Sequence, residues 1–212
     1  MAYTYTSKQD YSKAIYYYKK ALKLYEKFTE EGVSISKCHS GLAEIYLKMG
    51  DKDKVSEQLK LAEKFNHYVQ KNHFENVIDL APLIKVHALH NQNYRLAYQQ
   101  SKKQIYLDSA YQAAQTGVAA INFLKNQLSL SDGRSRLVND NYPIYEGFLQ
   151  TLKAFKEDST DKKAFEVAEQ CKSLQLYEAM KNTKAVTFGQ VPPQYLAQEK
   201  IFSIFHGFIQ LQ

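Results

Sequence analysis

Apolar residues recur every three to four positions along most of the chain, the spacing that places side chains on one face of a helix. Three polar turn signals interrupt this pattern, at Gln9-Asp10-Tyr11, Gly50-Asp51-Lys52 and Gln92-Asn93-Tyr94. A long stretch with helical periodicity follows each signal, and the runs of Val and Thr that are typical of strands are scarce. The pattern therefore predicts an all-α chain of amphipathic helices joined by short turns.

The turn signals are evenly spaced. Five residues after the first member of each signal lies a small or modest residue, namely Ala14, Val55 and Ala97, and these are separated by 41 and 42 residues. The first two units also agree at other positions, where Ala2, Tyr5, Tyr18 and Ala21 match Ala43, Tyr46, Leu59 and Ala62. The third unit agrees only at its turn and at Ala97. A fixed period of this size is typical of stacked helical hairpins.

This pattern of small and large residues resembles the tetratricopeptide motif, in which small side chains let two antiparallel helices approach and larger ones fill the gaps between neighbours. The period exceeds the usual length of about 34 residues, so the chain resembles an extended variety with longer helices. The resemblance implies a right-handed α-solenoid of antiparallel helix pairs over residues 1–128, with a truncated first repeat and a degenerate third. It also implies uncapped apolar surface at both ends, and self-association through that surface.

After residue 128 the period is lost, but helical periodicity continues over residues 129–212. We expect a further hairpin there, with one helix around Ile144 to Leu152 and another from about Lys162 to Met180, which Ser159 or Thr160 caps. A final helix is expected to begin near Pro193 and to lead into a C-terminal domain beyond this sequence.

Three short motifs follow one another in this second half: Tyr142-Pro-Ile-Tyr-Glu146, the stretch from Ala164 to Leu176, and the stretch from Val191 to Glu199. Together they resemble the helical segment that leads from tetratricopeptide repeats into CHAT domains, the caspase-like and separase-like cysteine peptidase relatives of bacterial multidomain proteins. The resemblance implies that a CHAT domain follows Gln212, and that the repeats present a partner to it or hold it inactive. CHAT enzymes place a His and a Cys at strand ends, so no residue of this helical chain corresponds to theirs.

The charge balance narrows the choice of partners. The chain has 28 Lys and Arg residues against 22 Asp and Glu residues, a formal net charge of +6, and clustered cations favour nucleic acid. However, only Arg95, Arg134 and Arg136 are arginines, the residue preferred for phosphate and base recognition. The lysines between Lys13 and Lys27 fit a solvated helix face. We therefore predict a protein or peptide partner and no nucleic acid.

The sequence predicts neither secretion nor membrane insertion. It shows no signal peptide, and it contains no run of about 20 apolar residues. Cys38 and Cys171, the two cysteines, lie far apart without metal-ligand spacing, which favours a reducing compartment. We therefore expect a cytoplasmic protein without a membrane partner.

Few residues suggest catalysis or metal binding. His87 and His90 lie three apart on a predicted helix, but no Cys or acidic pair accompanies them locally, so surface or interface histidines are the better interpretation. The same holds for His67 and His73. Cys171 is expected to be a packed side chain in mid-helix, and no phosphate-binding loop or nucleophile elbow occurs. We predict a chain that is not an enzyme and that has no catalytic residue, no metal and no cofactor.

If the helix pairs stack, the first helix of each pair forms the inner wall of the stack. The positions predicted on that wall are Lys37, Ser40, Glu44 and Lys48 in the second unit and Asp79 and His90 in the third. This mixture of charge suits an extended or helical peptide that bears both signs. The leading hypothesis is therefore a non-catalytic protein–protein interaction and regulatory scaffold of a larger protein, next to a CHAT domain.

Two alternatives stay open. Similar extended repeats occur in the sensor regions of signalling histidine kinases, and Tyr106-Leu-Asp108-Ser109 resembles that class. The other alternative is an enzyme that uses Cys171 and a histidine as a dyad.

Overall fold

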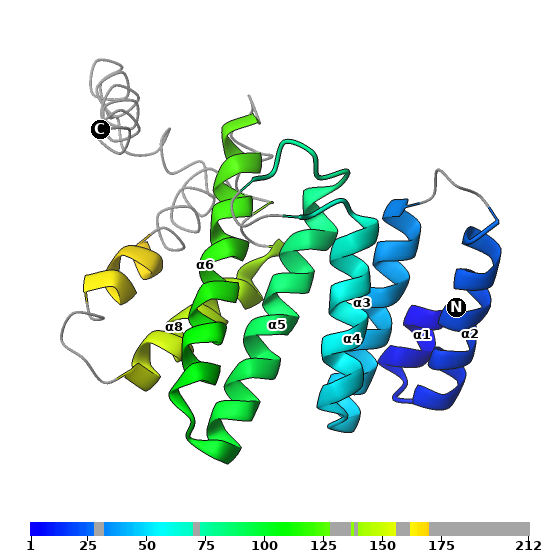
Figure 1. Ribbon diagram of the computed structural model, residues 1–212, viewed down its shortest axis with the longest axis horizontal. Helices are drawn as coiled ribbons and strands as arrows, with labels where there is room; N and C mark the ends of the chain where they lie inside the picture. The colour runs from blue at the N-terminus through cyan, green and yellow to red at the C-terminus, as the bar shows by residue number, and fades with distance from the viewer. Residues whose placement is uncertain (28–31, 70–72, 128–136, 138–139, 156–161, 170–212) are drawn as a thin grey trace, which may run out of the picture. The chain divides into compact units, whose positions relative to one another are not determined.

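The computed structural model describes residues 1–27, 32–69, 73–127, 137, 140–155 and 162–169. The chain divides into two compact units, Met1–Cys171 and Lys172–Gln212, and the second lies wholly outside the described residues. All the described secondary structure is helical (Figure 1), which confirms the predicted all-α character for this part of the chain. The helices are α1 (Ala2–Ser7), α2 (Tyr11–Tyr25), α3 (Gly32–Met49), α4 (Lys52–Phe65), α5 (Leu80–Ser101), α6 (Gln104–Gln127) and α8 (Tyr142–Phe155), and residues 162–169 are helical as well.

The turn between α1 and α2 and the turn between α3 and α4 have the same structure. The backbone enters the left-handed region at Gln9 (φ 60°) and at Gly50 (φ 79°). Asp10 and Asp51 then begin the next helix, and the side chain of each accepts a hydrogen bond of 3.2 Å from the backbone N–H three residues later. These caps satisfy amide groups that a helix start leaves without partners. The first two predicted turns are thus confirmed.

A lysine and a tyrosine extend the likeness between these two turns. The ammonium of Lys13 lies 2.8 Å from the carboxylate of its cap residue and 5.5 Å from the centre of the Tyr5 ring. Lys54 lies 2.5 Å from its cap carboxylate and 5.3 Å from the centre of the Tyr46 ring. All these positions are 41 residues apart, so the period between the first two units is present in the geometry as well as in the sequence.

The third predicted turn is wrong. Gln92-Asn93-Tyr94 lies inside α5, which continues from Leu80 to Ser101. The chain turns instead at Lys102, whose φ of 56° is left-handed, and α6 begins two residues later. Polar side chains are compatible with a helix where they reach solvent or a partner: Gln92 is exposed, and the Nδ2 of Asn93 donates a 3.3 Å hydrogen bond to Ser56 on α4.

The true turn gives the third unit a different register. Relative to Lys102, the residue that corresponds to Ala14 and Val55 is Leu107, and the three side chains are at most 1% exposed. Tyr98 likewise takes the place of the tyrosines that precede the first two turns, with the Lys102 ammonium 5.6 Å from its ring centre. This register lies 52 residues after the second unit instead of the predicted 42. A search for one fixed period therefore misses this third unit. Ala97 is not the residue that corresponds to Ala14 and Val55.

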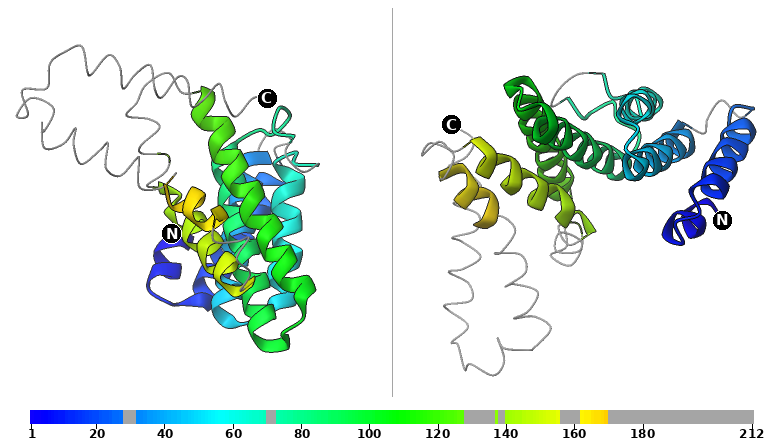
Figure 2. Two further views of the ribbon diagram at one scale, coloured as in Figure 1. Left: turned by 90° about the vertical axis from the view of Figure 1, so that its left-hand side faces the viewer. Right: turned by 90° about the horizontal axis from the view of Figure 1, so that it is seen from below.

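The later helices pack on the pair before them (Figures 1 and 2). Helix α3 packs against α2 and α4, and α5 packs against α3, α4 and α6. Helix α8 packs against α5 and α6, the pair before it, just as α5 packs against α3 and α4. As a result α5 has neighbours on both of its long sides.

The part of the second half that the structure describes agrees with the expected helices. Helix α8 contains the predicted stretch around Ile144 to Leu152, with Pro143 as its second residue, and residues 162–169 begin the next helix. The predicted cap residues Ser159 and Thr160 lie outside the described residues. The same is true of Cys171 and of the final predicted helix.

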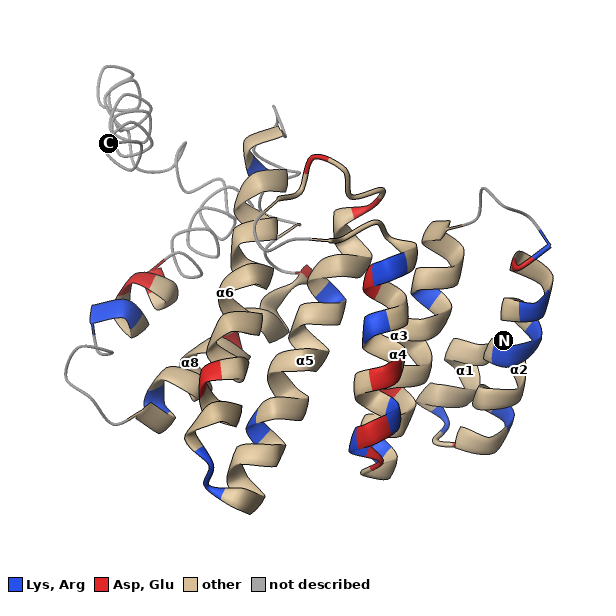
Figure 3. Cartoon of the chain, in the orientation of Figure 1, with Lys and Arg blue, Asp and Glu red and all other residues tan. Residues whose placement is uncertain are grey.

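The surface of α2 is basic and solvated, as predicted. Lys13, Lys19, Lys20 and Lys23 are all exposed, and Figure 3 shows that α4 in contrast carries both signs of charge. Among the described helices, none combines the length and the apolar character that crossing a bilayer requires.

Candidate functional site

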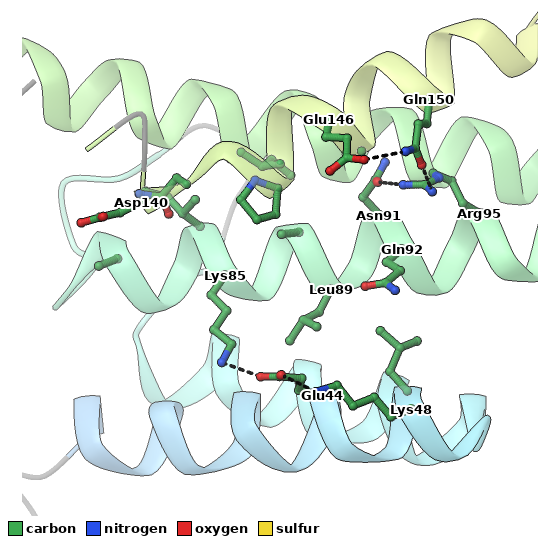
Figure 4. A pocket seen from close by; sticks show the side chains of 18 of the residues that line it. Glu44, Lys48, Lys85, Leu89, Asn91, Gln92, Arg95, Asp140, Glu146 and Gln150 are labelled. Carbon is green, nitrogen blue, oxygen red and sulfur yellow. Dashed lines mark hydrogen bonds and ion pairs between the residues drawn. The ribbon is translucent and has the colours of Figure 1, made fainter. Parts of the chain in front are cut away.

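A groove of about 770 Å³ lies along the middle of α5 between α3 and α8, and we call it the α5 groove (Figure 4). Its floor is formed by residues of α5 at helical spacing, namely Ala81, Lys85, Ala88, Gln92 and Arg95. Its walls are formed by residues of the two flanking helices, mainly Glu44, Leu47 and Lys48 of α3 and Pro143, Ile144, Glu146 and Gln150 of α8. The alanines in the floor leave room for the main chain of an occupant close to α5.

On the α3 side of the groove, one acidic side chain pairs with two lysines. Glu44 lies 3.2 Å from the ammonium of Lys48 on its own helix and 2.8 Å from that of Lys85 on α5. Burial alone would raise the pKa of Glu44, but the hydrogen bonds and charges of the two lysines outweigh burial, so its pKa lies below the usual value. This side of the groove therefore has its acid ionised and carries a net positive charge at neutral pH.

On the α8 side, a chain of polar side chains leads from α5 to α8. The guanidinium of Arg95 donates to Asn91 Oδ1 at 3.3 Å and to Gln150 Oε1. The amide of Gln150 donates in turn to Glu146 Oε1 at 3.0 Å. These contacts place a cation between two neutral amide oxygens at the end of the groove, as Figure 4 shows.

Asn91 joins three helices. Its Nδ2 donates to the carbonyl oxygen of Ala110 on α6 at 2.9 Å and to Thr151 Oγ1 on α8 at 2.8 Å. Asn91 and Thr151 are both almost fully buried, and a buried polar group is costly unless its hydrogen bonds are made. The position of α8 against α5 and α6 therefore depends on this amide.

Gly147 lets α8 come close to this amide. A Cβ at Gly147 would lie 2.4 Å from Asn91 Oδ1, which is closer than any ordinary contact. We therefore expect Gly147→Ala to lower the free energy of unfolding by about 1 to 3 kcal/mol, the usual cost of overpacking. Urea denaturation followed by circular dichroism measures this.

The matched control is the same glycine substitution in an Asn91→Ala background. There the obstructing amide is gone, and only the higher helix propensity of alanine acts. The added methyl group is then expected to be neutral or stabilising. An equal loss in the free energy of unfolding in the two backgrounds would show that the contact with Asn91 is not what excludes a side chain at residue 147.

Five of the six residues predicted for the inner wall lie on or next to grooves formed by α3 and α5. Glu44 and Lys48 line the α5 groove. Lys37 and Ser40 line a second pocket of about 440 Å³ between α2, α3 and α5. Asp79 caps the start of α5, and its carboxylate lies 3.2 Å from the ammonium of Lys37. The structure thus brings Lys37 and Asp79 together, while their role in binding stays a prediction.

His90, the sixth residue, does not lie with the others. It is buried between α4 and α5, where its Nε2 lies 3.4 Å from Glu63 Oε1. His90 was predicted on the wall because it lies 42 residues after Lys48, the assumed spacing between the second and third units. In the structure this spacing is 52 residues, so His90 is not the equivalent of Lys48. His90 is therefore corrected from a wall residue to an interior residue.

His87 lies beside His90 in the same interface. Its Nε2 is 3.9 Å from Glu63 Oε1, and neither of its ring nitrogens has a hydrogen-bond partner among the described residues. Burial lowers the pKa of His87 to about 4, despite the opposing charge of Glu63, so the ring is neutral at neutral pH. These two histidines are interface residues, whereas His67 and His73 are exposed.

Neither metal ligands nor a reactive thiol are found in the described parts of the chain. Within those ranges no group of three or more His, Cys, Asp or Glu side chains is arranged to hold a metal ion. Cys38 is buried, and burial raises the pKa of its thiol to about 11. A protonated thiol is a poor nucleophile, so Cys38 suits packing. The other cysteine, Cys171, lies outside the described residues.

Comparison with known proteins adds no family to this picture. No family model, curated protein or solved structure matches the chain.

Sequence reasoning missed the floor of the groove. Gln92 and Arg95 were not predicted as wall residues because a turn was expected at residues 92–94, and Lys85 was not because the step of 42 residues gave the third unit the wrong register. One signal argued against that turn: no glycine or proline occurs between Pro82 and Ser101, so the segment had no strong helix breaker. A continuous helix over this segment would have placed these three side chains on one face.

Proposed function

We propose that this chain is a non-catalytic protein-binding module whose helix pairs stack as a right-handed solenoid, and that the α5 groove holds a segment of another protein. The observation that carries the proposal is the groove itself, in which α5 presents small residues in the floor and the three helices together present charges of both signs. Such a surface suits an extended peptide whose side chains include both apolar and charged groups.

The packing of the helices supports the stacked arrangement. Helix α8 meets α5 and α6 as α5 meets α3 and α4, so one kind of interface is used more than once. The same structural positions recur at Ala14, Val55 and Leu107, all of them buried. In a solenoid each unit covers the apolar face of its neighbour, and repeated interfaces are what such an array requires.

The lining of the groove favours binding over catalysis. The described residues that line it include no His, Cys, Ser or Thr, so the usual pairing of a hydroxyl or thiol nucleophile with an imidazole base is not offered there. Of the three described acidic residues that line it, Glu44, Asp140 and Glu146, Glu44 is ionised and already paired with Lys48 and Lys85. These groups suit recognition of charged side chains.

The expected neighbour of the module is a CHAT domain, as the resemblance of the second half implies, and we propose that the bound segment is presented to it. The gene sequence that follows Gln212 tests this part separately. Successive strand patterns that end in a His and a Cys would support it. A long coiled helix with a phosphoacceptor His would instead support the alternative, in which this chain is the sensor region of a histidine kinase.

Charge reversal on the α3 side of the groove tests the binding function. A random 12-residue peptide library is selected against the chain, and the dissociation constant of the best synthetic peptide is measured by fluorescence anisotropy. The double variant Lys48→Glu/Lys85→Glu is expected to weaken binding about tenfold or more, because it places three acids where one acid and two lysines stood.

The matched control is Lys19→Glu/Lys23→Glu. It changes the net charge by the same amount on the exposed face of α2, outside the groove, and is expected to leave the dissociation constant within about twofold. Circular dichroism confirms that both variants fold. The proposal fails if no peptide is enriched, or if the two double variants weaken binding equally.

A further inference from the structure

Arg95 differs from the other cations of the α5 groove. Lys48 and Lys85 both pair with Glu44, whereas Arg95 forms no ion pair with any described residue and contacts only amide oxygens, those of Asn91 and Gln150. The nearest acidic influence on its guanidinium is the charge of Glu146, whose carboxylate instead accepts from the Gln150 amide at 3.0 Å. Within the part of the chain that the structure describes, Arg95 is therefore the cation of the groove that has no counter-ion.

The orientation of this cation is fixed by its partners. Asn91 is held by its two hydrogen bonds to α6 and α8, so its Oδ1 has a defined direction toward Arg95. Gln150 is held by its bond to Glu146. A guanidinium has five N–H donors in a planar fork, and these contacts use only two of them. The other donors are available to an occupant of the groove, without the loss of side-chain freedom that ordering a surface arginine would cost.

Partial burial makes a counter-ion favourable. Burial lowers the pKa of Arg95, although the charge of Glu146 opposes this effect, and a guanidinium remains charged under all ordinary conditions. A half-buried charge that lacks an opposite charge is costly, and a carboxylate that accepts two parallel hydrogen bonds from the fork offsets that cost.

We infer that Arg95 is the specificity-determining residue of the α5 groove, and that it binds the carboxylate side chain of an Asp or Glu within a partner peptide. This inference rests on the proposed function and deepens it by naming the chemistry of the bound segment. The floor from Ala81 to Arg95 covers 14 helical steps, or about 21 Å, which is the length of about six extended residues.

The occupant is a side-chain carboxylate and not the free end of a chain. Recognition of a terminal carboxylate commonly uses a nest of free backbone N–H groups. Arg95 lies well inside α5, far from its N-terminal Leu80, where backbone N–H groups are already bonded within the helix. The site thus offers a fork of side-chain donors alone, which suits a carboxylate within a continuing chain.

Parallel peptide selections test this inference. A random 12-residue library that is displayed with its C-terminus fused, so that no peptide has a free terminal carboxylate, is selected against the wild-type chain and against Arg95→Gln. Wild-type selections are expected to share an Asp or Glu at one fixed position. Selections on Arg95→Gln are expected to lose the preference at that position.

A double-mutant cycle then measures the contact. In a synthetic peptide from the wild-type selection, replacing the shared acid by its amide is expected to weaken binding to the wild-type chain about tenfold, and to change binding to Arg95→Gln by less than about twofold. Arg95→Lys keeps the charge without the fork and is expected to lie between them. Lys60→Gln on α4, outside the α5 groove, is the control that keeps the full tenfold effect.

The outcomes separate this inference from the function on which it rests. Peptides that bind and respond to Lys48→Glu/Lys85→Glu but share no acidic position would overturn the role of Arg95 and leave the binding module intact. An acid preference that persists in Arg95→Gln, or binding that requires a free C-terminus, would overturn it as well. Failure of every peptide to bind would overturn both proposals.

Discussion

Replacing Leu59 by alanine is expected to lower the free energy of unfolding by about 3 to 5 kcal/mol. Leu59 lies on α4 and is fully buried in the hydrophobic cluster that α2, α3, α4 and α5 share. The substitution loses the transfer free energy of the side chain and leaves a cavity that the four helices fill only in part. Domains are commonly stable by about 5 to 15 kcal/mol, so this one change removes a large share of the stability.

Leu24→Ala is the matched control for Leu59→Ala. It is the same substitution in another helix, α2, but the Leu24 side chain is 53% exposed. Its effect is expected to stay within about 0.5 kcal/mol. Urea denaturation of both variants gives the comparison, and equal losses would contradict the packing of α4 with Leu59 toward the core.

Acidification to about pH 4 is expected to lower the free energy of unfolding by about 3 kcal/mol through His87 alone. Burial between α4 and α5 lowers the pKa of this histidine from 6.5 to about 4 in the folded chain. Between these two values the unfolded chain binds a proton at His87 and the folded chain does not. The stability that the neutral ring provides is therefore complete above about pH 6.5 and is lost as the pH falls toward 4.

The neighbours of His87 act in the same pH range. Glu63 faces it from α4, His90 lies on the same helix with its ring centre 6.0 Å away, and the ring centre of Tyr68 lies at 5.2 Å. Burial raises the pKa of Glu63, but its hydrogen bond to His90 and the nearby positive charges lower the pKa by more than burial raises it. The pKa of Glu63 therefore lies below the usual 4.5. The stability that Glu63 provides is therefore present above its unfolded pKa and is lost as the pH falls through its folded pKa, which adds to the loss from His87.

The variant His87→Leu isolates the contribution of this ring. It removes the titrating group while keeping an apolar side chain in the interface, so the free energy of unfolding is expected to change much less between about pH 6.5 and 4 than in the wild type. His73→Leu is the control, because His73 is exposed and its surroundings differ little between the folded and unfolded chains. Denaturation series at several pH values measure both slopes. An unchanged slope in His87→Leu would refute the assignment.

Much of the local structure was predictable because its causes are local. Asp10 and Asp51 cap helices through the backbone N–H three residues later, and the glycine at residue 50 permits the left-handed turn before the second cap. Such interactions join residues a few positions apart, so the local sequence is enough to predict them. The helix that begins at Tyr142 was predicted for the same reason, because its apolar periodicity is contained within the segment.

The groove was predicted only in part, because its geometry depends on α5. Glu44 and Lys48 were expected on the inner wall of the stack from their place in the second repeat unit, and both line the α5 groove. The pairing of Glu44 with Lys85 on α5 joins two helices that are far apart in the chain, and nothing near either residue reveals it. The misplaced turn also separated Gln92 and Arg95 from the face to which they belong.

The sequence by itself determined that the described segments of this chain are helical, where the first two turns lie, and which faces of these helices are apolar. The absence of Gly and Pro around residues 92–94 was compatible with a helix, but only the tertiary structure supplied a partner for the Asn93 amide, on Ser56, 37 positions earlier in the chain. The tertiary structure also decided that His87 and His90 are buried and that Arg95 has no counter-ion among the residues that the structure describes. The physical reason is the same in each case: the state of a polar side chain depends on the groups that surround it after folding, and these come from distant segments.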